Sequence, residues 1–291
     1  MQMPAHAISA MFVLDASTPA PEIARTASRL LLTDTDWTVV VVAEPHPSLT
    51  SGATGFAAPV LSEDEMDAEF RTEQARADAA AEATARALGN RAIRQVVEHG
   101  DAVGAIRALL DEAPCDLVVA ASTDLAEDLT HDDVPRVLAI PSAASVDVDG
   151  PVLIAIDDSP LDERIADTVA TLFRSTTEIL TLHVTPTTPP GVPTTSFGAV
   201  GAPAPTDLGQ PLADQAQQAA ERSTNRSGLR DVTPVGAIGD PVAGILEAAD
   251  EHRAAIIVLG SRDRSWWSRL FNPSVSDAVR SRSDRPILIL R

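Results

Sequence analysis

The chain is 291 residues long and 44% hydrophobic, which is enough apolar material for folded cores and indicates about two domains. It carries 42 acidic and 22 basic residues, a net charge of −20. An acidic surface of this size argues against non-specific binding to nucleic acids or anionic membranes, because both are polyanions.

The N-terminal stretch has a short apolar run that ends at Asp15, with no basic segment before it, so it does not resemble a secretory leader. No apolar run approaches the roughly 20 residues needed to cross a bilayer, and we expect a cytoplasmic protein. Cys115 is the only cysteine, which excludes an internal disulfide and a cysteine-based metal site. Its position before an apolar run predicts a buried, inert thiol.

Short runs of Val, Ile and Leu alternate with helical segments along the chain. Runs that are apolar throughout predict strands buried on both faces, as in a parallel sheet. Residues 64–88 are rich in Ala, Glu and Arg without Gly or Pro, which predicts a long helix. Residues 240–252 open with Asp and then Pro, a favourable N-cap and first-turn pair that predicts another helix.

Three segments of the first half recur in the second half in the same order. In both halves the first apolar run is followed by Asp, one further residue and Ser. The segment after the third predicted strand begins with Gly-Asp in both halves. Such a repeat predicts two copies of one domain, which we place at 1–145 and 150–291. The expected fold is α/β, with two tandem doubly wound, Rossmann-like α/β/α domains and mainly parallel five-stranded sheets. The matched segments are 11–17 with 153–159, 38–45 with 178–186, and 96–122 with 235–261.

Two stretches interrupt this pattern, at 45–60 and 186–205, each after the second strand of its copy. Both are rich in Pro, Gly, Ser and Thr, which is typical of long surface loops. They are either lids over a site or mobile connectors without a role, and the residues do not favour one over the other.

Ligands of a doubly wound sheet bind at the carboxyl ends of the strands, where the strand order reverses. In the second copy two loops should meet there, 156–160 after the first strand and 260–279 after the fourth. The second of these loops begins with Gly260 and leads into a predicted helix, which is how many proteins build a phosphate cradle.

The second copy resembles the universal stress protein (UspA) family in "VLIAIDDSPLDERIADTVATLF", "GDPVAGILEAADEHRAAIIVLGSRDRS" and "NPSVSDAVRSRSDRPILIL". In the first copy the resemblance covers the early strands and "HGDAVGAIRALLDEAPCDLVVAAS". Family members that bind ATP carry G-x-x-G-x9-G-[ST] after the fourth strand and an aspartate after the first. The resemblance places that aspartate on Asp157, the backbone contact after the second strand on Val184, and the first glycine on Gly260.

Two glycines of the family pattern are absent, because Asp263 and Pro273 take their places, while Ser274 matches the final position. An aspartate carboxylate repels phosphate, and a proline has no N–H to donate. A helix start remains, capped either by Asn272 or by Ser274. We expect any anion to meet the N–H groups near Ser274, Val275 and Ser276.

Arginines are concentrated near this loop, with six between residues 260 and 285 against three aspartates. They either hold a phosphate with side chains, Arg262 being the candidate nearest Gly260, or balance the acidic charge of the neighbouring copy or of a partner. Trp266 and Trp267 either stack on a base or, as we favour, pack the loop against the body or a partner.

The first copy lacks most of this loop. Ser122 and Pro135 are 13 positions apart, whereas Ser261 and Pro286 are 25 positions apart. We interpret the missing twelve residues as most of the phosphate loop and the last helix. Asp15 remains after the first strand, with Ala121 in place of the glycine, and the first copy is expected to have lost the site.

The resemblance implies a stress-response regulatory protein with at most one weak ATP site, in the second copy, and Mg²⁺ only with nucleotide. The alternative is a scaffold that binds no nucleotide. No G-x-S-x-G motif or placed general base is present, so we expect no enzyme, with slow ATP hydrolysis as a weaker alternative.

The last strands, 136–140 and 286–290, are expected to pair within the chain as a pseudo-dimer. A homodimer and an unidentified protein partner are the other expected contacts, with no nucleic acid and no membrane.

Overall fold

A computed structural model describes residues 8–15, 20–32, 34–43, 63–89, 94–132, 134–141, 148–156, 165, 168–169, 171–173, 177–185, 209–227, 231–260 and 275–291. The chain divides into two compact units, Met1–Ala143 and Ala144–Arg291, and each is described by itself. The loops 45–60 and 186–205 lie outside the described residues.

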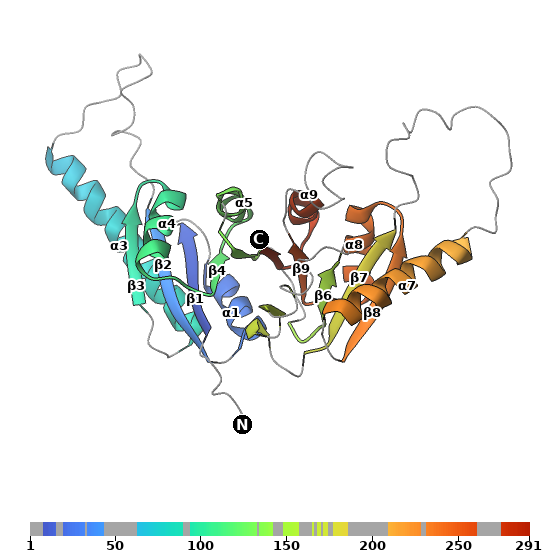
Figure 1. The fold of residues 1–291 in the computed structure, drawn as a ribbon. Coiled ribbons are helices and arrows are strands. Elements are labelled where there is room, and N and C mark those ends of the chain that lie inside the picture. The colour runs from blue at the N-terminus through green and yellow to red at the C-terminus, as the bar shows by residue number, and fades with distance from the viewer. Residues whose placement is uncertain are drawn as a thin grey trace, which may run out of the picture. The chain divides into compact units, whose positions relative to one another are not determined.

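The first unit holds a parallel sheet of five described strands in the order β3-β2-β1-β4-β5 (Figure 1). Strand and helix alternate as the apolar runs predicted. The elements are β1 (Ile8–Asp15), α1 (Ala20–Leu30), β2 (Thr35–Ala43), α3 (Glu63–Leu88), β3 (Arg94–His99), α4 (Ala102–Glu112), β4 (Leu117–Ala120), α5 (Thr123–His131) and β5 (Arg136–Ala139).

The second unit repeats this arrangement, with its described strands in the order β10-β9-β6-β7-β8, again all parallel. The predicted α/β class and the doubly wound parallel sheets are therefore confirmed. The elements are β6 (Val152–Ala155), β7 (Ile179–Thr185), α7 (Gly209–Ser227), β8 (Val232–Ile238), α8 (Pro241–Glu251), β9 (Ile256–Gly260), α9 (Val275–Arg282) and β10 (Ile287–Leu290).

Each sheet is buried on both faces, because alternate residues of a strand point to opposite sides. In the first unit, α4 and α5 pack on Met11 and Val13 of β1 and their neighbours in the other strands. Phe12, between those two residues, points to the other face and meets Trp37 with ring centroids 6.3 Å apart. In the second unit α8 and α9 cover the corresponding face, through Ile245 and Val279 among others.

The helix after the third strand starts in the same way in both units. Asp101 accepts a hydrogen bond from the Gly104 N–H at 2.9 Å, and Asp240 accepts one from the Ala243 N–H at 2.9 Å. Each aspartate satisfies a helix donor that would otherwise lack a partner. The predicted N-cap at Asp240 and the proline at the first helical position are confirmed.

The helix α7 lies closer to its sheet than a side chain would allow. An alanine Cβ at Gly236 of β8 would lie 2.3 Å from the Gln217 N and 2.5 Å from the Ala216 C. The Gln217 side chain uses this proximity, because its amide donates to the Pro234 O at 3.1 Å and accepts from the Gly236 N–H at 3.0 Å. This contact fixes α7 against β8.

The lone thiol of Cys115 is half-buried and donates a hydrogen bond to the Leu117 O at 3.3 Å. Burial raises the pKa of the Cys115 thiol above its usual value, so the thiol form is favoured over the reactive thiolate. The structure therefore agrees with the predicted inert thiol.

Within the described ranges, no helix is both long and apolar enough to cross a bilayer. The same residues contain no cluster of three or more His, Cys, Asp or Glu side chains arranged to hold a metal ion.

Candidate functional site

The strand order of the second unit reverses between β6 and β9. The chain goes from β6 to β7 on one side, then crosses after β8 to β9 on the other side. A ligand crevice is expected at the carboxyl ends of these two strands. Gly260 is the last residue of β9, where it is half-buried and pairs with Leu290. Ile156 continues β6 and donates to the Leu182 O at 2.9 Å.

The backbone polar groups of Val184 point to the β6 side of β7, where the crevice is expected. Leu182 directs its carbonyl toward β6, and residues two apart in a strand direct their polar groups to the same side. Val184 lies two residues beyond Leu182, where β6 has ended. Neither its N–H nor its carbonyl has a partner among the described residues. The residue as a whole is buried, with 2% of its surface exposed, and its side chain packs against α8.

The N-terminal end of α9 lies after β9 in the chain. The helix begins at Val275, and Asp277 lies in its first turn. A start at this residue agrees with the capping alternative in which Asp277 follows Ser274 by three residues. Ser276 is buried, with 7% of its surface exposed. Because the Asp277 carboxylate lies in the first turn of α9, its negative charge competes with any phosphate for that end of the helix.

Two of the six arginines in this region form hydrogen bonds or ion pairs with other residues of the chain. Arg285 donates to the Ala254 O at 2.7 Å and to the Asp250 carboxylate at 2.8 Å. Arg280 is 4% exposed and its guanidinium lies 3.9 Å from the Asp277 carboxylate. Arg282 lies in the last turn of α9, at the opposite end from Val275. Arg280 and Arg285 therefore contact aspartates of their own unit.

The remaining predicted residues of this site lie outside the part of the chain that the structure describes: Asp157, Arg262, Arg264, Trp266, Trp267, Arg269 and Ser274.

The first unit differs from the second at the matching position. The helix α5 begins at Thr123, directly after Ser122, whose hydroxyl caps it by accepting from the Leu125 N–H at 3.2 Å. Ala121, buried at 1% exposure, takes the place of Gly260. The prediction that the last helix is missing was wrong, since α5 is present and packs on the sheet through Ala126 and Leu129. What the first unit lacks is the connection between strand and helix.

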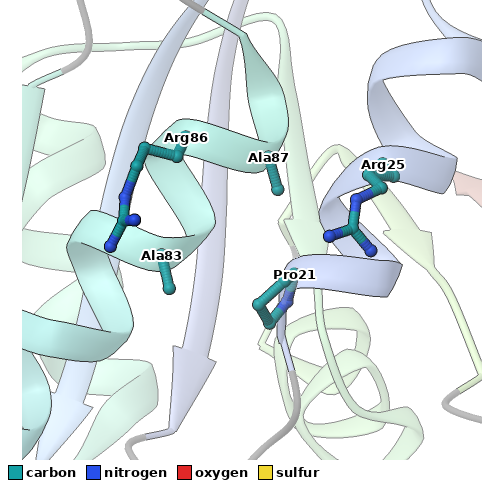
Figure 2. Close-up of a pocket in the computed structure, with 5 residues that line it drawn as sticks. All are labelled: Pro21, Arg25, Ala83, Arg86 and Ala87. Carbon is teal, nitrogen blue, oxygen red and sulfur yellow. The ribbon is translucent and has the colours of Figure 1, made fainter.

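A surface pocket lies elsewhere, between α1 and α3 of the first unit (Figure 2). Its volume is about 460 Å³, and its lining combines two exposed arginines with small apolar residues. Sequence reasoning missed this pocket, because its two helices are separated in the chain and neither carries a recognisable motif. The lining residues are Pro21, Arg25, Ala83, Arg86 and Ala87.

Comparison with known proteins supports the resemblance seen in the sequence. The sequence model of the Universal stress protein family matches residues 150–291. A stretch of 53 residues is 42% identical to the stress response protein NhaX of Bacillus subtilis, and covers 18% of this chain and 32% of that protein. The chain thus matches about a third of the length of this curated relative.

Solved structures are similar to the chain over a wider range. A universal stress protein from Archaeoglobus fulgidus superposes with a TM-score of 0.60 and 16% identity over 98% of this chain and 96% of that one. Another universal stress protein from Archaeoglobus fulgidus, solved with dAMP, has a TM-score of 0.30 and 18% identity over 49% of this chain and 98% of that one. The first likeness shows that the fold is shared, and the family match shows that residues 150–291 are a domain of the universal stress protein family.

Proposed function

We propose that the chain is a stress-response regulatory protein of the cytoplasm, with at most one weak ATP site, in the second unit, and none in the first. The observation that carries this proposal is the difference after the fourth strand. In the first unit Ser122 both ends the connection and caps α5, whereas fourteen residues, 261–274, separate β9 from α9. A phosphate loop needs several consecutive backbone N–H groups, and the two residues between β4 and α5 provide too few.

The ligand would lie across the carboxyl ends of β6 and β9, with Mg²⁺ arriving only with the nucleotide. Asp157 follows Ile156 directly in the chain, and we assign it to the adenosine end. The Val184 backbone would make a polar contact, and Gly260 would let the chain turn close to phosphate. Arg262, Ser274, Val275 and Ser276 would surround the phosphates. No residue has an assigned catalytic role, so the site would bind without turnover.

We expect calorimetric titration with ATP and Mg²⁺ to give weak binding at no more than one site per chain. Asp157→Ala should abolish this binding, because it removes the one carboxylate assigned to the adenosine end. Asp15→Ala, at the matching position of the first unit, should leave the binding unchanged. Binding that survives Asp157→Ala but is lost in Asp15→Ala would contradict the assignment to the second unit.

We further propose that β5 and β10 pair within the chain, which gives a pseudo-two-fold monomer. Each strand is the last one of its five-stranded sheet and is largely buried and apolar. An unpaired apolar edge strand would be prone to aggregation. An experimental structure should show the two strands about 5 Å apart. A separation beyond about 10 Å, twice that spacing, would rule the pairing out.

The alternative is a scaffold whose two units act only through protein contacts. The Asp277 carboxylate at the start of α9 and the two engaged arginines favour it. Titration that shows no ATP binding at millimolar concentration would select this alternative.

A further inference from the structure

The two units differ at their outer edge strands, β3 and β8, and the difference suggests how two copies of the chain associate. The strands can be aligned residue by residue. Gly100 after β3 donates to the Ala43 O at 3.2 Å, and Gly239 after β8 donates to the Thr185 O at 3.0 Å. Counting back from these glycines matches Gln95 with Pro234 and Val97 with Gly236.

The outer edge of β8 is closed. Successive residues of a strand direct their polar groups to alternate sides, and Gly239 faces β7, so Pro234 and Gly236 face away from the sheet. Pro234 has no N–H, its carbonyl accepts from the Gln217 side chain, and the Gly236 N–H donates to the same side chain. An added strand would find these groups occupied.

Among the described residues, no strand or side chain covers the outer edge of β3. By the same alternation Gln95 and Val97 face away from β2, and their N–H and carbonyl groups have no partner among the residues that the structure describes. Val97 carries the side chain that Gly236 lacks, so a helix cannot approach the edge here as α7 approaches β8. Open strand edges are templates for pairing with another chain.

We propose that β3 pairs antiparallel with β3 of a second copy, with Val96 opposite Val96. A two-fold axis requires that residues facing outward lie opposite one another. Centring on Val96 meets this requirement, because Gln95 of each copy then lies opposite Val97 of the other. Each of these two pairs would exchange two backbone hydrogen bonds, which gives four in all.

The sequence of β3 is self-complementary in this register. Written from either end, "RQVVE" places the arginine at position 94 opposite the glutamate at position 98 of the other copy, and opposite charges across a strand pair are favourable. Registers centred on Gln95 or Val97 do not bring positions 94 and 98 together. Self-complementarity favours a second copy of this chain over an unrelated extended peptide.

Sedimentation equilibrium on the full chain tests the proposal. Wild type should show a monomer–dimer equilibrium that strengthens with added salt, because each copy carries a net charge of −20 and the copies repel each other. Gln95→Pro removes one backbone donor from each copy and should weaken the dimer at least about tenfold. The variant should fold, since proline already occupies the equivalent position of β8. Pro234→Gln is the matched control and should dimerise as wild type does.

Disulfide trapping fixes the register independently. In a Cys115→Ala background, Val96→Cys should cross-link two chains under oxidising conditions. A directly opposed, non-hydrogen-bonded pair has Cα atoms about 4.5 Å apart, within the range of a disulfide. Val97→Cys should not cross-link, because it lies opposite Gln95. The proposal fails if wild type stays monomeric, if Gln95→Pro dimerises as wild type does, or if Val97→Cys cross-links as readily as Val96→Cys.

Discussion

Gly236→Ala is expected to lower the free energy of unfolding of the second unit by about 2–4 kcal/mol. The new Cβ would meet the backbone of α7, 2.3 Å from the Gln217 N, and backbone cannot rotate away as a side chain can. Overpacking of this kind costs about 1–3 kcal/mol. Displacing α7 would also strain the two Gln217 hydrogen bonds, each worth about 1 kcal/mol. Urea denaturation followed by circular dichroism measures the change.

Gly244→Ala is the matched control for this prediction. Its Cβ would approach the Val184 methyl groups at 3.1 Å, which are the ends of a side chain and can adjust. Gly244 lies inside α8, where alanine improves helix propensity by about 1 kcal/mol. The two effects oppose each other, and we expect a stability within about 1 kcal/mol of wild type. A Gly236→Ala variant as stable as Gly244→Ala would contradict the close approach of α7.

Restoring both glycines of the family pattern, Asp263→Gly with Pro273→Gly, is expected to tighten ATP binding about 10- to 150-fold. One recovered hydrogen bond to a charged group is worth about 1.5–3 kcal/mol, which corresponds to that range. Removing the Asp263 carboxylate adds to the gain, because it no longer repels phosphate. Calorimetric titration of the double variant beside wild type measures the change.

Asp231→Gly provides a control for the loss of charge. Asp231 precedes β8, at the amino ends of the strands and away from the proposed site, and its φ of 57° suits glycine. This variant should bind ATP as wild type does. If the double variant also binds no more tightly than wild type, the two lost glycines do not explain the weakness of the site.

Much of the fold could be predicted because its signals are local. The apolar runs, the uninterrupted segment that forms α3 and the Asp-Pro pair that starts α8 each specify an element within a few residues. The helix α5 was missed because "DLAEDLTHDD" is strongly acidic and resembled the remnant of a lost loop. The signal was present: Ser122 is a favourable N-cap, and Leu125, Ala126 and Leu129 have helical spacing.

Contacts between residues far apart in the chain could not be predicted in the same way. Arg285 contacts Asp250, 35 positions earlier, and Gln217 contacts Gly236, 19 positions later. Such pairs depend on how helices pack on the sheet, and a single sequence does not record that packing. The proposed contact at Val184 came from the family resemblance, and the position of this residue beyond the end of β6 follows from β7 being the longer strand.

The most direct test of the claim that nucleotide binds only to the second unit is photolabelling with 8-azido-ATP. The labelled peptides are then mapped. We predict that the labelled peptides come only from residues 144–291, at no more than one label per chain, and that competition requires ATP well above micromolar concentration. Labelling of peptides from residues 1–143, or competition by micromolar ATP, would contradict a single weak site.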